Sequence, residues 1–143
     1  MTMGAKKGTT LVEVLFSAAI IGLVIGSILL IFAQTVDMSK KVDYEYAATV
    51  IARSQLEWAK AFIEINGFDA LTQDGFGGVG RLDWHGEPAE TGDFMRTTTV
   101  EEAFDGNSAL TRVNVEVSYT YRGKETENPI TLTTVFIDTT EEE

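Results

Sequence analysis

Apolar and polar positions divide the chain into an N-terminal half that reads as helix and a C-terminal part that reads as strand. Residues 14–33 carry no charge and are mostly apolar, and Glu13 comes directly before them. A helix of that length rises about 30 Å, which matches the hydrocarbon core of a bilayer. The next Gly or Pro after this run is Gly67. The pattern therefore predicts a helix that continues to about Ile65 and stops at Asn66-Gly67.

Residues 34–66 are predicted to form an amphipathic half of this helix. Apolar or small residues recur there at the spacing of one helical face, which is typical of a helix that covers a core. The predicted stripe consists of Ala47, Val50, Ile51, Ser54, Trp58, Ala61, Phe62 and Ile65. We interpret Trp58 and Phe62 as core residues rather than as a binding platform.

Residues 67–93 are rich in Gly and Asp and contain Pro88. They are expected to form a connecting loop with room for a short strand or turn. Residues 75–80 match the letters Gly-x-Gly-x-x-Gly of dinucleotide-binding loops. The required strand before this motif and helix after it are not evident, so we interpret the motif as a flexible loop.

Residues 94–140 are predicted to form an antiparallel sheet. The segment from Phe94 to Glu102 is rich in Thr, and Asp105-Gly106-Asn107 is a turn signal. Two later segments alternate apolar and polar residues with period two, which predicts strands with one buried face. Their inward positions are Val113, Val115, Val117, Tyr119 and Tyr121 in one, and Ile130, Leu132, Thr134 and Phe136 in the other.

The apolar face of this sheet needs a partner, and the stripe between Ala47 and Ile65 is the long apolar surface that the chain offers. The predicted fold class is therefore α+β, with a long N-terminal helix packed against a small antiparallel sheet. Residues 141–143 are an acidic tail.

Charge and composition narrow the range of functions. The 143 residues include 11 Lys and Arg against 22 Asp and Glu, a formal net charge of −11. An acidic surface repels phosphate backbones, so no nucleic-acid partner is expected. The chain has no Cys, which excludes a disulfide framework and a thiolate metal site.

Side chains suited to catalysis or metal binding do not form a recognisable set. His85 is the only His and is interpreted as a solvated loop residue, because a zinc site needs further ligands. Several carboxylates offer oxygen ligands for Ca²⁺, but their spacing matches no known loop. They are Asp69, Asp74, Asp83, Glu87, Glu90 and Asp93. No Ser lies in a nucleophile elbow, so we predict neither an enzyme nor a cofactor.

Glu13 lies just inside the border of the apolar segment, where a charged side chain is costly and is usually paired or functional. Lys6 and Lys7 precede Gly8, which is followed by Thr9, and Glu13 is the fifth residue after Gly8. This N-terminus, with its Thr-Leu-Val-Glu run, resembles that of type IV prepilins and type II secretion pseudopilins.

The resemblance implies that residues 1–8 are a leader, with Lys6 and Lys7 as its basic pair. A prepilin peptidase would cut after Gly8, and Thr9 would become the N-methylated first residue of the mature chain. Glu13 would then act in filament assembly. Residues 9–33 would be the transmembrane half of a pilin-like helix, and residues 34–66 the amphipathic half.

The implied product is a structural subunit of a pilus or secretion pseudopilus. Leu30 stands where many major pilins carry Pro, which favours a minor pilin or pseudopilin. The implied partners are the prepilin peptidase and methylase, other pilin or pseudopilin subunits, and an inner-membrane platform with its assembly ATPase. The chain would cross the bacterial inner membrane once, with the C-terminal domain outside the cytoplasm. The alternative is a signal-anchored, monomeric binding or sensor domain.

Overall fold

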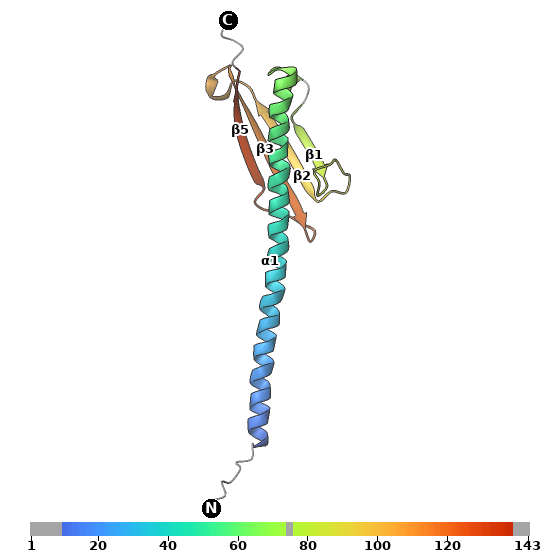
Figure 1. The fold of residues 1–143 in the computed structure, drawn as a ribbon, viewed down its shortest axis with the longest axis vertical. Coiled ribbons are helices and arrows are strands. Elements are labelled where there is room, and N and C mark those ends of the chain that lie inside the picture. The colour runs from blue at the N-terminus through green and yellow to red at the C-terminus, as the bar shows by residue number, and fades with distance from the viewer. Residues whose placement is uncertain (1–9, 74–75, 139–143) are drawn as a thin grey trace, which may run out of the picture. The chain divides into compact units, whose positions relative to one another are not determined.

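The computed structural model describes residues 10–73 and 76–138. The chain divides into two compact units, Met1–Lys40 and Lys41–Glu143. The elements in chain order are helix α1 (Leu11–Asn66), helix α2 (Ala70–Gln73), strands β1 (Gly78–Leu82) and β2 (Phe94–Glu101), the 3₁₀ helix η1 (Phe104–Gly106), and strands β3 (Leu110–Tyr121), β4 (Lys124–Glu125) and β5 (Ile130–Ile137) (Figure 1). The fold is α+β, as the sequence predicts.

The sheet is antiparallel throughout and has β3 at its centre. Its order is β1-β2-β3-β4, and β5 also pairs with β3. Strand β3 contacts β2 through residues 112–119 and β5 through residues 110–117. The strands predicted from alternation are confirmed, because Val113, Val115 and Val117 are fully buried on one face of β3.

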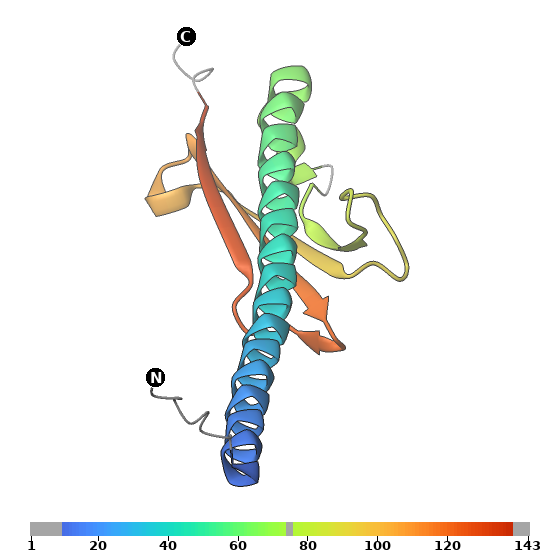
Figure 2. The ribbon, with the colours of Figure 1, turned by 60° about the horizontal axis from the view of Figure 1, so that its bottom comes forward.

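The C-terminal half of α1 covers one face of the sheet, as Figures 1 and 2 both show. The helix residues buried there are Ala48, Ile51, Ala52, Gln55 and Ala59. Three of the five are Ala, so small side chains dominate the buried face of the helix. Opposite them lie fully buried sheet residues such as Phe94 and Leu82. The predicted packing partner of the sheet is therefore confirmed.

The predicted helix stripe is wrong in part, because the buried face is rotated around the helix from the expected one. Val50 is 47% exposed, Trp58 55% and Ile65 81%, whereas Ile51 is buried and Phe62 is partly buried. Trp58 stacks on Phe76 with ring centroids 5.0 Å apart. It is thus a rim residue and not the core residue that we predicted.

The predicted flexible loop at residues 75–80 is also wrong in part. Gly78–Leu82 form β1, which pairs in continuous register with β2 from Gly78 opposite Thr98 to Leu82 opposite Phe94. Residue 75, the first of this motif, lies outside the described residues. The motif therefore enters an edge strand, and no helix opens at its glycines as a dinucleotide site requires.

Gly92 marks a close approach of two backbone segments. A Cβ atom there would overlap the carbonyl group of Leu82. We expect Gly92→Ala to destabilise the fold by about 1–3 kcal/mol, the usual cost of overpacking. Chemical unfolding of the full-length protein in detergent measures this, with Gly80→Ala as the control because a Cβ at Gly80 meets nothing within 4 Å. Equal stability of the two variants would contradict the close approach.

Candidate functional site

The N-terminus of α1 is capped by Thr10. The Thr10 hydroxyl oxygen accepts a hydrogen bond from the Glu13 backbone N–H at 3.4 Å. The Thr10 carbonyl oxygen accepts bonds from the N–H groups of Glu13 and Val14 at 3.0 and 3.2 Å. Thr10 is thus the N-cap residue and Glu13 the third residue of the helix, the spacing of a capping box.

Glu13 is the only charged residue between Thr10 and Val36. Its position in the first turn of α1 suits a carboxylate, because the N-terminal end of a helix carries partial positive charge. The helix dipole alone stabilises a carboxylate by about 0.3–1 kcal/mol. That is far less than the cost of burying a lone charge in an apolar assembly. Glu13 therefore needs a cationic partner wherever this helix is enclosed.

All side chains from Leu11 to Val36 are exposed in the isolated chain. An apolar surface of this extent is not stable in water and has to be covered by lipid or protein. Within the described residues, α1 is long and apolar enough to cross a membrane. The membrane anchor predicted from the sequence is therefore compatible with the helix.

Two hydroxyl groups within this apolar segment form hydrogen bonds inside the helix. The Ser27 hydroxyl donates to the Leu23 carbonyl oxygen at 2.8 Å, and the Thr35 hydroxyl donates to the Ile31 carbonyl oxygen at 2.9 Å. Gly22 and Gly26 have open space where a Cβ would lie. Their four-residue spacing leaves a flat surface that another helix can approach.

The other predicted site residues, Lys6, Lys7, Gly8 and Thr9, lie outside the described residues. The structure thus gives the surroundings of Glu13 and not those of the predicted cleavage site.

Asp83, in the loop after β1, has a structural role. One Asp83 oxygen accepts hydrogen bonds from the backbone N–H groups of His85 at 2.8 Å and Glu87 at 3.0 Å. These bonds, first that of Glu87 and then that of His85, lower the pKa of Asp83 from its ordinary value. Among the described residues, no group of three or more His, Asp or Glu side chains is placed to hold a metal ion.

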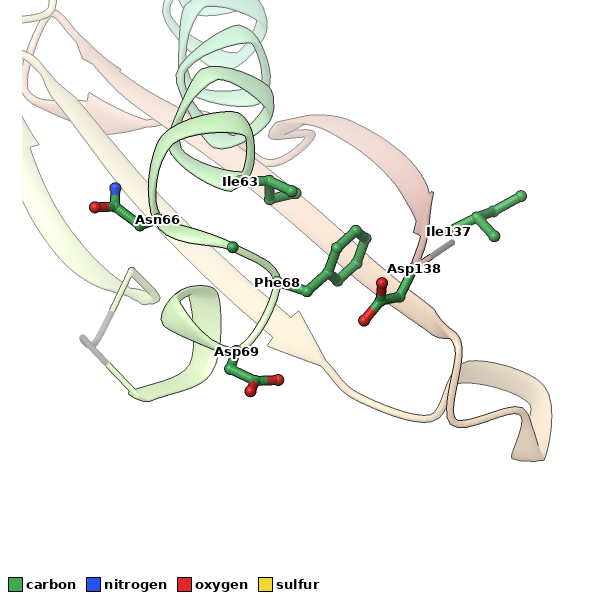
Figure 3. Close-up of a pocket in the computed structure, with 7 residues that line it drawn as sticks. Ile63, Asn66, Phe68, Asp69, Ile137 and Asp138 are labelled. Atoms are coloured by element: carbon green, nitrogen blue, oxygen red, sulfur yellow. The ribbon is translucent and has the colours of Figure 1, made fainter. Parts of the chain in front are cut away.

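A pocket of about 450 Å³ lies where the end of α1 meets the end of β5 (Figure 3). Its lining residues are Ile63, Asn66, Gly67, Phe68, Asp69, Ile137 and Asp138. They include no Ser, Cys or His, so this lining provides no nucleophile with a neighbouring base. This pocket could not be predicted from the sequence, because its walls come from segments far apart in the chain.

A cluster of aromatic rings around Tyr44 was also not expected. The Tyr44 ring lies 4.4 Å from that of Trp84, 5.5 Å from Tyr119 and 5.8 Å from Phe94. Burial, and then the charge and hydrogen bond of Asp93, raise the pKa of Tyr44. Tyr44 joins α1 to the sheet through these ring contacts. Glu45 does so through a hydrogen bond, since the Tyr119 hydroxyl donates to a Glu45 oxygen at 3.4 Å. The cluster stabilises the fold.

Comparison of the chain with protein-family models, curated proteins and solved structures gives no match.

Proposed function

We propose that the chain is the precursor of a minor type IV pilin or type II secretion pseudopilin. It would be cut after Gly8, N-methylated at Thr9 and packed by α1 into a pilus or pseudopilus. The observation that carries the proposal is a lone carboxylate in the first turn of α1, in a segment from Leu11 to Val36 that is otherwise uncharged and wholly exposed. The residues before Thr10 support it, because Lys6, Lys7 and Gly8 stand at the spacing of a prepilin cleavage site.

Cleavage would supply the missing partner of Glu13. An α-amino group is largely protonated near neutral pH, and methylation leaves an amine that still binds a proton. We propose that Glu13 of one subunit pairs with the Thr9 amine of its neighbour. A subunit in the wrong register would leave two charges unpaired in an apolar core, which is strongly unfavourable. The pair would thus fix the axial position of each subunit.

The proposal assigns partners to each step. A prepilin peptidase and methylase would process the N-terminus, and an inner-membrane platform with its ATPase would add the subunit to other pilin or pseudopilin subunits. In this arrangement the chain is a single-pass protein of the bacterial inner membrane before assembly. The domain formed by the sheet and the second half of α1 would face the periplasm or the outside.

Mass spectrometry of the membrane-bound protein tests the proposal by identifying its N-terminus. We expect a methylated Thr9 in the wild type. Gly8→Val should leave the leader attached, because a branched side chain blocks access of the peptidase to the bond. Insertion should be unchanged, since residues 14–33 are not altered.

The matched control is Gly4→Val, which makes the same change within the leader and should still be processed. An N-terminal Thr9 in the Gly8→Val protein would contradict the assigned cleavage site. An intact leader in the wild-type protein, expressed with the peptidase, would favour the signal-anchored binding domain instead.

A further inference from the structure

The two edges of the sheet differ in how they are protected. At its C-terminal end, the outer edge of β1 is covered by the loop that follows it. The Ala89 N–H donates to the Arg81 carbonyl oxygen at 3.0 Å, the Asp83 N–H donates to the Glu87 carbonyl oxygen at 2.9 Å, and Leu82 forms a bridge with Pro88. A covered edge with a Pro is a usual defence against pairing with another chain.

The outer edge of β5 has no such cover among the described residues. Ile130–Ile137 contain no charged residue and no Pro, and they pair with β3 residue by residue without a bulge. Figure 2 shows β5 at the border of the sheet. Natural sheets usually protect an edge strand of this length with a charge, a Pro, a bulge or a covering segment.

The pairing pattern shows which backbone groups face outward. The Asp138 N–H donates to the Ala109 carbonyl oxygen at 2.8 Å, so residues 109 and 138 form a hydrogen-bonded pair. Such pairs alternate along an antiparallel ladder. Thr131, Thr133, Val135 and Ile137 therefore point both their N–H and their C=O groups away from β3. The intervening residues of β5 are bonded to β3.

The side chains of these four residues leave room for another strand. All four are exposed, with Val135 at 43% and Ile137 at 63%. β-Branched residues of this kind pair well across strands. The edge thus offers a row of donors and acceptors together with partly apolar side chains, the requirements of strand addition.

Charge indicates the kind of partner. Glu116 is the pairing partner of Thr131 in β5, Glu127 lies three residues before the strand, both are exposed, and the chain has a net charge of −11. A second copy of this chain would bring the same acidic groups to the contact, and like charges disfavour pairing. A strand with basic ends would be attracted instead.

We propose that the outer edge of β5 accepts an extended segment of another protein, uncharged and β-branched over its centre and carrying Lys or Arg at its ends. The segment would continue the sheet beyond β5. This inference does not depend on filament assembly, because every residue that carries it lies in Lys41–Glu143.

Amide hydrogen exchange in the full-length protein in detergent micelles tests the inference residue by residue. The probe is a synthetic peptide of alternating Thr and Val with Lys at both ends. At saturating peptide, we expect exchange at Thr131, Thr133, Val135 and Ile137 to slow by about tenfold, roughly the effect of one net hydrogen bond per amide. The amides between them should change little, because they are already bonded to β3.

Three outcomes would overturn the proposal. The alternating protection could be missing, it could arise in the protein alone as its concentration rises, or a peptide with Glu ends could produce it equally well. The second outcome would assign the edge to a second copy of this chain. The third outcome would show that the edge of β5 has no preference for a segment with basic ends.

Two variants of Val135 distinguish the contribution of its backbone N–H from that of its side chain. Val135→Pro removes one outward N–H and should abolish the protection by the peptide, whereas Val135→Ala keeps the N–H and should retain most of it. Circular dichroism checks that both variants are folded, since Pro is tolerated at an edge position whose N–H faces solvent. If Val135→Pro does not fold, the exchange pattern in the wild-type and Val135→Ala proteins shows whether the outer edge of β5 binds the peptide. Equal protection in a folded Val135→Pro protein would overturn the proposal.

Discussion

Glu13→Val is expected to insert into the membrane and to be processed after Gly8, yet to fail to join a filament. The substitution makes the first turn of α1 wholly apolar, so insertion does not suffer. It leaves the proposed Thr9 amine of the neighbouring subunit without an anion. Breaking a buried ion pair by removing one partner costs about 3–5 kcal/mol, so subunit contacts should fall by a hundredfold or more.

Local loss of helix stability cannot produce an effect of that size. Glu13 occupies the third helical position, where a carboxylate contributes about 0.3–1 kcal/mol through the helix dipole. The Thr10 cap remains, because it bonds the backbone N–H of residue 13 and not its side chain. Glu13→Gln gives a second measurement, since it keeps the shape of the side chain and removes only its charge. It should fail in assembly as Glu13→Val does.

Crosslinking between Cys-tagged subunits in membranes measures the contacts, with leader removal followed in the same samples. Glu57→Val is the matched control, because it removes another carboxylate from α1. Glu57 pairs only loosely with Arg53, at 3.7 Å, and both side chains are largely exposed. Surface pairs of this kind contribute little, so contacts should persist. Wild-type crosslinking in processed Glu13→Val protein would remove the assembly role given to Glu13.

The strands and the length of the helix could be predicted because their patterns are strong and local. Alternation in β3 places Val113, Val115 and Val117 on one face, and the structure buries all three. The helix ends at Asn66, beside the predicted Gly67, whose φ of 84° is readily adopted only by a residue without a side chain. In these elements local sequence and tertiary packing favour the same structure.

The rotation of the buried helix face could not be predicted from hydrophobicity. Large apolar residues such as Val50 and Trp58 define the more conspicuous stripe, but the face that is buried against the sheet carries small side chains. Ala48, Ala52 and Ala59 on that face are fully buried. Ala carries a weak hydrophobic signal, so the contact face is identified only once the sheet is in place.

The candidate functional site likewise has one part that could be predicted from the sequence and one part that could not. The position of Glu13 relative to the helix start follows from the Thr-x-x-Glu spacing, and the structure has that geometry. The pocket at the end of α1 depends on Ile63 and Ile137, which the chain fold brings together from widely separated positions. The strand β1 was obscured because Gly78 and Gly80 have low strand propensity. It forms because β2 provides a complete ladder of backbone partners.

Phe94→Ala is expected to be the most destabilising single substitution in the domain formed by the sheet and the second half of α1. Phe94 is 1% exposed, and its ring lies 5.1 Å from Trp84 and 5.8 Å from Tyr44. Truncating a buried Phe removes its transfer free energy and leaves a cavity, at a cost of about 3–5 kcal/mol. The surrounding rings are anchored on α1, β3 and the loop after β1, so the cavity cannot easily close.

Trp58→Ala is the comparison that decides between the two helix faces. If Trp58 were core, as the sequence pattern predicts, its loss would cost as much as that of Phe94. Its side chain is 55% exposed and pairs with the rings of Phe76 and Phe62, so we expect about 1–3 kcal/mol, the usual value of two aromatic pairs. Denaturant unfolding of the full-length variants in the same detergent measures both. A larger loss of stability for Trp58→Ala than for Phe94→Ala would show that the buried face runs through Trp58 after all.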